Sequence, residues 1–528
     1  MIQALMLLAA GAASTAPRIG DLPISRDRID RAAPRAPVPV QPVRIPAKVI
    51  SVGSDTPIKG IRFRGAKAPA PVAAAAGRFL GKPATAKTLG ELAAALSTAY
   101  GSSAVALYTV AIPEQDFAGG IVTVSLTEGS IARVEIQGDP KRHPQLRRRL
   151  APLTQQKPLS RATFERQLTL AQAIPGLTMT PQFTDPNFDG ALVMGVAVKQ
   201  KRHKLTGGFS SRGIDLLGGG QFDAALELYG TAIDGDQFTL TGSAARDFKR
   251  YRFASAGYSA PIGGDGLTAG LSAAYFETRP KFIPIRGKAR QAAASLSYPL
   301  IHSFKRSADV SLSFEGLNSD NAAFGNIIAS ERTRVVRGAA SFSVTLPNRS
   351  ASVLVSLSKG FDGLGARAAA PYIQPDFLKA TAAASVAQAI GKRAALRGSL
   401  TAQYTRDNLP AAERMTLGGE TIGRAFDTGV LSGDRGVGAL AEFAYQPLKI
   451  ERLKTSEIYT FIDEGRLTVL GAPGLADQSY SLGSAGAGFR ARYREKYELG
   501  LEGSRVIDRP TPGYAEKWRL TVSWRITT

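Results

Sequence analysis

Residues 517–526, KWRLTVSWRI, alternate apolar and polar side chains from end to end. The apolar set is Trp518, Leu520, Val522, Trp524 and Ile526, and the polar set is Lys517, Arg519, Thr521, Ser523 and Arg525. A strand repeats every two residues, so these sets lie on opposite sides of a sheet. One side suits lipid and the other suits a water-filled lumen, which is typical of a transmembrane β-barrel strand.

The same alternation recurs in segments of about ten residues from Lys204 to the end of the chain. Turn-forming pairs such as Asp234-Gly235 separate these segments. We place strands starting near residues 204, 219, 236, 251, 267, 288, 307, 333, 349, 377, 393, 437, 456, 480, 495 and 516. A soluble propeller or solenoid would also have many short strands, but the repeated blade motif of a propeller is missing. The sequence therefore predicts a 16-stranded antiparallel membrane barrel over residues 204–528.

The composition of the 528-residue chain limits its chemistry. It has no cysteine, which removes disulfides, thiolate zinc sites and cysteine nucleophiles. Its histidines, His143, His203 and His302, stand in no metal-ligand spacing, and no nucleophile with a base and an orienting partner emerges. We therefore expect no cofactor, no metal and no enzymatic activity.

The formal net charge of +23 could indicate nucleic acid, anionic membrane or acidic partners. Most of the basic residues are dispersed. The one compact cluster consists of Lys141, Arg142, Arg147, Arg148 and Arg149. No aromatic-interleaved basic motif accompanies it, so we expect a solvated helix face and no nucleic-acid partner.

The N-terminal segments predict export. Residues 1–16 are an apolar stretch ending in small residues, as in a signal peptide, although the usual basic start is missing. Residues 17–46 combine a short candidate helix with a proline-rich spacer.

Residues 47–130 and 131–203 show mixed helix and strand periodicity. In the first segment, helical spacing from Thr88 to Tyr100 precedes strand alternation over Ile121–Leu126. In the second, a helix over Ser160–Ala173 begins with a good N-cap. The sequence thus predicts two small α/β domains in tandem before the barrel.

One long connection, residues 406–436, interrupts the series of short turns, and long loops in compact folds are usually functional. Its glycine-rich part could cradle a phosphate, but neither a P-loop lysine nor a following helix supports that. It contains Ile422-Gly-Arg-Ala-Phe426, and the second strand beyond it contains Phe461-Ile-Asp-Glu-Gly465.

With these two motifs the chain resembles the outer-membrane transporters of two-partner secretion, the haemolysin activation and secretion family. That family belongs to the superfamily of the barrel-assembly insertases. The resemblance extends to the α/β segments, which look like two polypeptide-transport-associated (POTRA) domains. Two positions depart from the family pattern: Ala425 stands where glycine is common, and Thr528 where an aromatic residue usually ends the barrel.

The resemblance implies a site formed by the loop tip and the barrel wall. The loop residues are Ile422, Gly423, Arg424, Ala425 and Phe426, and the wall residues are Phe461, Asp463 and Gly465. Arg424 should reach into the lumen and bond Asp463 bidentately. The alternative is that each side chain faces lumen water.

The resemblance also implies a function. The chain should carry a secreted exoprotein of haemolysin or adhesin type through its barrel without nucleotide hydrolysis. It would lie in the bacterial outer membrane, in contact with lipid and lipopolysaccharide, with its N-terminal domains in the periplasm and residues 17–46 closing the pore at rest. A barrel-assembly insertase and a passive porin or receptor stay open as alternatives.

Overall fold

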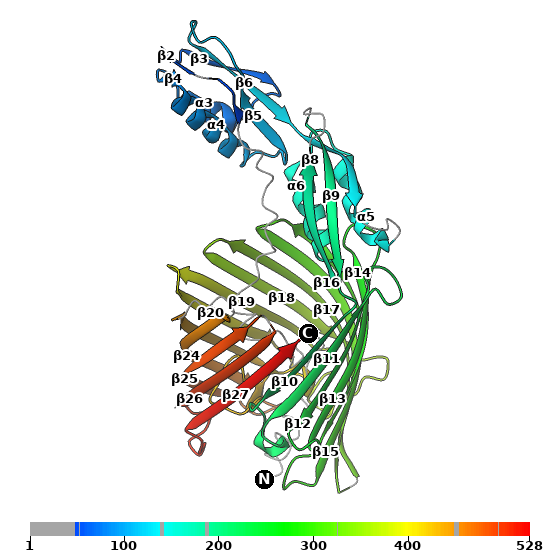
Figure 1. The fold of residues 1–528 in the computed structure, drawn as a ribbon. Coiled ribbons are helices and arrows are strands. Elements are labelled where there is room, and N and C mark those ends of the chain that lie inside the picture. The colour runs from blue at the N-terminus through cyan, green and yellow to red at the C-terminus, as the bar shows by residue number, and fades with distance from the viewer. Residues whose placement is uncertain are drawn as a thin grey trace.

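The computed structural model describes residues 48–528 except 52, 138–141, 185–189, 325, 448–452 and 495. The expected signal peptide and the expected plug and linker, residues 1–46, lie outside this part of the chain. Two small α/β domains follow one another and lead into one large barrel (Figure 1).

The first α/β domain packs two helices on a small sheet. Its elements are β1 (Lys48–Val49), β2 (Gly53–Pro57), β3 (Gly60–Gly65), α3 (Ala70–Gly77), β4 (Pro83–Thr85), α4 (Ala86–Tyr100), β5 (Tyr108–Ile112) and β6 (Ile121–Glu128). The main sheet has the order β1-β5-β6-β3, and β2 pairs with β4. The helical spacing recognised in the sequence puts Leu89, Leu92 and Leu96 of α4 into the core.

The second α/β domain has a three-stranded sheet of order β7-β9-β8. Its elements are β7 (Ser130–Ile136), α5 (Pro144–Leu150), η2 (Ala151–Thr154), α6 (Arg161–Gln172), β8 (Leu177–Thr184) and β9 (Ala191–Gln200). The side chain of Ser160 caps α6 by accepting the N–H of Thr163. None of the helices in the described residues is long and apolar enough to cross a membrane.

Sixteen antiparallel strands form a closed barrel, which confirms the predicted fold class and strand number. They are β10 (His203–Ser210), β11 (Gln221–Tyr229), β12 (Gln237–Ala245), β13 (Tyr251–Pro261), β14 (Thr268–Thr278), β15 (Ile285–His302), β16 (Arg306–Ala323), β17 (Asn326–Leu346), β18 (Arg349–Gly360), β19 (Leu378–Ile390), β20 (Ala394–Thr405), β23 (Arg435–Tyr445), β24 (Leu453–Val469), β25 (Gln478–Tyr493), β26 (Tyr497–Asp508) and β27 (Trp518–Thr527). β10 closes the barrel by pairing with β27 from Thr206 opposite Thr527 to Ser210 opposite Ser523.

The alternation within each strand separates an outer from an inner face. On β27, Trp518, Leu520 and Trp524 are exposed on the outside, whereas Thr521 is buried on the inside. On β24, Ile458 and Ile462 are likewise exposed, whereas Tyr459, Phe461 and Asp463, which alternate with them, are buried on the inside. The apolar outer face suits hydrocarbon, as the period-two pattern predicts.

The second α/β domain docks on the barrel turns at one end. Arg166 of α6 donates to Asp265 at 3.0 Å and to the carbonyl of Pro299 at 2.9 Å. The backbone N–H of Gln145 donates to Asp234 at 2.8 Å. The Tyr298 hydroxyl and the Arg166 guanidinium hold the pKa of Asp265 below its usual range. The turns that face this domain therefore mark the end of the barrel nearest the α/β domains (Figure 1).

Candidate functional site

The connection between β20 and β23, residues 406–434, folds back into the barrel lumen. It contains the short helix η4 (Ala411–Glu413) and a hairpin of β21 (Met415–Leu417) and β22 (Leu431–Gly433). The motif at residues 422–426 lies between the two hairpin strands, and Ala425 and Phe426 are fully buried. The loop tip is therefore enclosed by protein and does not project freely into lumen water.

Asp463, on the inner face of β24, holds the loop tip through its backbone. One carboxylate oxygen accepts the N–H of Gly423 at 2.6 Å, and the other accepts the N–H of Arg424 at 3.3 Å. Ser484 of β25 donates its hydroxyl to the second oxygen at 2.7 Å. Asp463 is buried, so these bonds replace the water that the carboxylate loses. At Asp463 the barrel wall therefore binds the backbone of the loop tip.

Two glycines make this close approach possible. Gly423 has a φ of +79°, and a Cβ there would lie 2.7 Å from Cδ1 of Leu482. On the wall, a Cβ at Gly465 would lie 2.6 Å from Cδ1 of Leu417 and 3.0 Å from Cγ2 of Ile422. A side chain at Gly423 would need space that Leu482 of the wall fills, and a side chain at Gly465 would need space that the docked loop fills.

The guanidinium of Arg424 meets a different set of groups. Its carbon lies 4.4 Å from the centre of the Phe461 ring, which gives a cation–π contact. Its Nη1 donates to Glu442 at 3.3 Å and to Glu502 at 3.4 Å. The expected bidentate pair between Arg424 and Asp463 is therefore wrong. The carboxylate is occupied by two backbone N–H groups and a hydroxyl, and the guanidinium points to the neighbouring glutamates.

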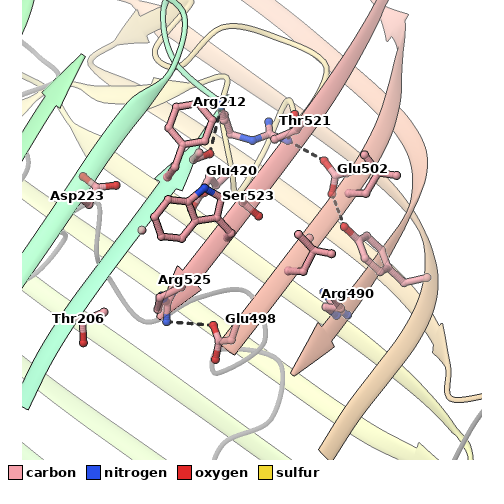
Figure 2. Close-up of a pocket in the computed structure, with 18 residues that line it drawn as sticks. Thr206, Arg212, Asp223, Glu420, Arg490, Glu498, Glu502, Thr521, Ser523 and Arg525 are labelled. Atoms are coloured by element: carbon pink, nitrogen blue, oxygen red, sulfur yellow. Dashed lines mark hydrogen bonds and ion pairs between the residues drawn. The ribbon is translucent and has the colours of Figure 1, made fainter. Parts of the chain in front are cut away.

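Arg212, which follows β10, joins the loop to the strands that close the barrel. It donates to Glu502 at 2.7 Å and to Thr521 at 3.2 Å (Figure 2). It also donates to two loop carbonyls, those of Arg424 at 2.7 Å and Gly419 at 3.0 Å. A single buried guanidinium therefore contacts the loop, β26 and β27. The pocket in Figure 2 lies beside this junction.

Two more arginines complete a buried charge network on the wall. Arg397 binds Glu442 at 3.0 Å and Glu457 at 2.8 Å. Arg490 binds Glu442 as well and Glu457 at 2.9 Å. In such a network, removal of one partner leaves a buried charge without compensation, which typically costs about 3–5 kcal/mol.

The base of the loop has its own anchors. Glu413 in η4 binds the buried ammonium of Lys379. Asp434, just before β23, accepts the N–H groups of Leu409 and Leu470, both at 2.9 Å. The loop is thus fixed at its base and at its tip.

The geometry predicts the outcome of a reciprocal charge swap. In the double variant Arg424→Asp with Asp463→Arg, the arginine would face the Gly423 and Arg424 backbone donors and the aspartate would face Glu442 and Glu502. Like groups would then oppose one another, so, for the secretion that the resemblance implies, we expect the double variant to export no more partner than either single variant. The measurement is the amount of partner protein in the medium. Recovery above both single variants would show that a direct side-chain pair operates.

The structure brings the predicted loop motif and wall motif together, Gly465 included. Several participants were missed from the sequence, among them Arg212, Glu442 and Glu502. A signal for the glutamates was present, because each is a carboxylate on the polar face of a predicted strand with apolar or small residues on both sides. Arg212 stands in a turn and carried no such signal.

Comparisons with known proteins agree with this architecture. The family model described as haemolysin secretion/activation protein ShlB/FhaC/HecB matches residues 195–491. The model for the POTRA domain of ShlB type matches residues 56–129. The outer membrane transporter CdiB of Dickeya dadantii (strain 3937) is 23% identical over 373 residues, which are 67% of this chain and 66% of that protein.

Two solved structures share the fold. CdiB from Escherichia coli superposes with a TM-score of 0.69 at 16% identity, covering 89% of this chain and 90% of the other. CdiB from Acinetobacter baumannii gives a TM-score of 0.63 at 15% identity, covering 100% of this chain and 97% of the other.

Proposed function

The chain belongs to the haemolysin secretion/activation family, and from this premise we propose that it secretes one partner exoprotein through its barrel. Members of the family are outer-membrane transporters with periplasmic POTRA domains, so the barrel lies in the outer membrane and the first α/β domain in the periplasm. The exoprotein that we propose as partner is of haemolysin or adhesin type.

The observation that carries the proposal is the joint arrangement of a closed 16-stranded barrel, an inward-folded loop and soluble domains docked at one rim. A barrel of this size has a lumen wide enough for an extended polypeptide. The loop lines that lumen between Asp463 and Glu502, where a passing chain would meet it. We propose that the docked loop keeps the lumen in its transport-competent form.

The sheets of the α/β domains offer a route for capture. In the second domain, β7 and β8 are the edge strands of a three-stranded sheet. An unfolded client can add a strand to such an edge through main-chain hydrogen bonds, which tolerate many sequences. Folding of the client outside the cell would then give transport its direction. No catalytic group and no nucleotide are needed, so the proposed activity is transport and not an enzymatic reaction.

The two alternatives are less favoured. The family model that matches residues 195–491 is that of haemolysin secretion/activation proteins, which favours secretion over barrel assembly. A passive porin or receptor would have no use for α/β domains that are hydrogen-bonded to the barrel turns. Secretion of a client gives both parts of the chain a role.

Co-expression tests the function. The chain should be produced with the secreted protein encoded beside it, which we expect to carry glycine- and asparagine-rich repeats, and the medium should be assayed for that protein. We expect secretion only when both are present. Secretion that is unchanged without this chain would refute the transporter. A general loss of outer-membrane barrels on its deletion would favour the insertase.

Removal of residues 17–46 tests the plug assignment, which concerns a segment outside the described residues. If this segment closes the pore, its deletion opens an aqueous path through the lumen. We therefore expect ion conductance in planar bilayers to rise several-fold over that of the full chain. Conductance equal to that of the full chain would remove the plug assignment and leave the barrel proposal standing.

A further inference from the structure

A basic patch on the outside of the barrel wall is unrelated to the lumen site. It lies on β14–β17, on residues that the strand register places side by side and that face outward. Tyr275 is opposite Arg290, Arg290 is opposite Asn318, and Asn318 is opposite Arg332. One step lower, Gly316 is opposite Arg334. The patch therefore forms a continuous surface across four strands.

The patch lies at the end of the barrel far from the α/β domains, which is the extracellular end. The turns bound by Arg166 and Gln145 connect β13 to β14 and β11 to β12. Arg290 lies toward the opposite end of β15, beyond Leu296 on the outer face. The lipid-facing band of such barrels is about 25 Å tall, or roughly ten tilted residues. Counted along β15 from its docked end at His302, Arg290 lies at the extracellular margin of that band.

The guanidinium groups of the patch are not neutralised. Arg334 donates to the carbonyls of Leu364 and Leu317, both at 3.2 Å, and to the Asn318 side chain at 2.9 Å. Within the part of the chain that the structure describes, neither Arg334 nor Arg290 forms an ion pair with a carboxylate. Their positive charge is available to an anion outside the barrel.

Just below these cations, the wall is hollowed. A groove on the outer face is lined by the small residues Ala256, Ala273, Ala292 and Gly316, and it is bordered by Arg290 and Arg334. A second apolar groove continues from it past Leu271, Leu296 and Leu312 toward the docked end. The grooves run along the membrane-facing surface, so an acyl chain can lie in them while its head group meets the arginines.

We propose that this patch binds a phosphorylated glycolipid of the outer leaflet, with its phosphate on Arg290 and Arg334 and an acyl chain in the groove. Two features favour this ligand: the positive charge of the patch and its position at the extracellular end of the barrel. Arginine suits phosphate because its planar fork can donate two parallel hydrogen bonds. Among the described residues none accepts from the Arg290 fork, whereas Arg334 is held by protein acceptors and contributes its charge. The extracellular end of the barrel is surrounded by the leaflet that contains lipopolysaccharide. The inference rests on the outer-membrane location and does not depend on secretion.

Lipid titration of the purified full chain tests the proposal. The probe is lipid A, with phosphatidylglycerol measured in parallel, and native mass spectrometry reports the bound lipid. The double variant Arg290→Gln with Arg334→Gln should bind lipid A about 30-fold more weakly than the parent chain, and each single variant about fivefold. The Ala292→Phe variant keeps both charges but fills the groove, and it should also weaken lipid A binding.

A charge-matched control is available at the other end of the barrel. Arg306 and Arg349 also lie exposed on the outer face, on β16 and β18 near the periplasmic turns. Arg306→Gln with Arg349→Gln removes the same charge and should leave lipid A binding unchanged. The proposal is overturned if the control loses as much binding as the patch variant, if the patch variant binds as the parent does, or if phosphatidylglycerol binds equally through the same arginines. Heat-modifiable electrophoretic mobility checks that every variant is folded.

Discussion

Replacement of Asp463 by alanine is expected to lower secretion of the partner by more than about tenfold. The change removes the acceptor for the N–H groups of Gly423 and Arg424 and for the Ser484 hydroxyl, all in a buried place. A buried donor that loses its acceptor typically costs about 1–3 kcal/mol. Loss of two such bonds costs at least about 2 kcal/mol, which exceeds the roughly 1.4 kcal/mol that corresponds to a factor of ten. The loop tip should therefore leave the wall. The measurement is the ratio of partner in the medium to partner in the cell.

Asp309→Ala is the matched control for this prediction. Asp309 also projects from the inner face of a barrel strand, but it binds His302 at 3.0 Å near the docked end. It has the same charge and is remote from the loop. Secretion should stay within about twofold of that of the parent chain. If Asp463→Ala secretes as well as Asp309→Ala while both are folded, the loop anchor has no part in transport.

Replacement of Gly465 by valine should give a loss of similar size by a steric route. A Cβ at this position would lie 2.6 Å from Leu417, too close for any side chain without movement of the loop. Overpacking of this kind typically costs about 1–3 kcal/mol, which corresponds to a shift of about fivefold to 160-fold away from the docked loop. All charges and hydrogen-bonding groups of the site remain, so this variant separates loop position from electrostatics. Secretion is again the readout.

Gly338→Val on β17 controls for the loss of a strand glycine. A Cβ at Gly338 would meet nothing within 4 Å, so the valine has room. Because β-branched residues favour strands, the barrel should fold at least as well as the parent. Equal secretion by the Gly465 and Gly338 variants would mean that the loop can dock despite the added side chain, or that docking is irrelevant.

Period-two alternation was sufficient to predict the barrel, because the outer face must be apolar on nearly every strand. The start of β23, placed near residue 437, is Arg435, and the start of β27, placed near residue 516, is Trp518. The error is larger for β17, placed near residue 333 but starting at Asn326. Its first residues pair with β16 beyond the lipid-facing band, where the consecutive Ile327 and Ile328 are both exposed and the alternation is lost.

The α/β domains were predicted where amphipathic helices are long. α4 and α6 have regular apolar spacing and serine or threonine N-caps. The short helix α3 (Ala70–Gly77) was missed, because its alanine-rich sequence has no distinct apolar face. The docking of the second domain was not foreseeable either, since Arg166 and Asp265 are far apart in the chain and look like ordinary surface charges.

For the site, too, the local sequence motifs could be recognised, whereas the contacts between distant residues could not be predicted. The loop motif and wall motif could be paired only through the family resemblance, and the structure does bring them together. The resemblance implied a side-chain pair between Arg424 and Asp463, but in the structure this carboxylate accepts backbone N–H groups of the loop tip. Gly423, with its positive φ, presents backbone N–H groups to the carboxylate, and sequence does not reveal that geometry. The guanidinium of Arg424 instead donates to Glu442 and Glu502, which only the tertiary fold brings next to it.

Disulfide trapping tests most directly the claim that Asp463 holds the loop against the barrel wall. The chain has no cysteine, so a single pair can be introduced. Cγ1 of Ile422 lies 2.9 Å from the position of a Cβ on Gly438, which places the two Cβ atoms within bonding range of a disulfide. Ile422→Cys with Gly438→Cys should become oxidised in the outer membrane and shift mobility in non-reducing electrophoresis. In the Asp463→Ala background the same pair should stay largely reduced. Equal oxidation in both backgrounds would contradict the anchoring of the loop by Asp463.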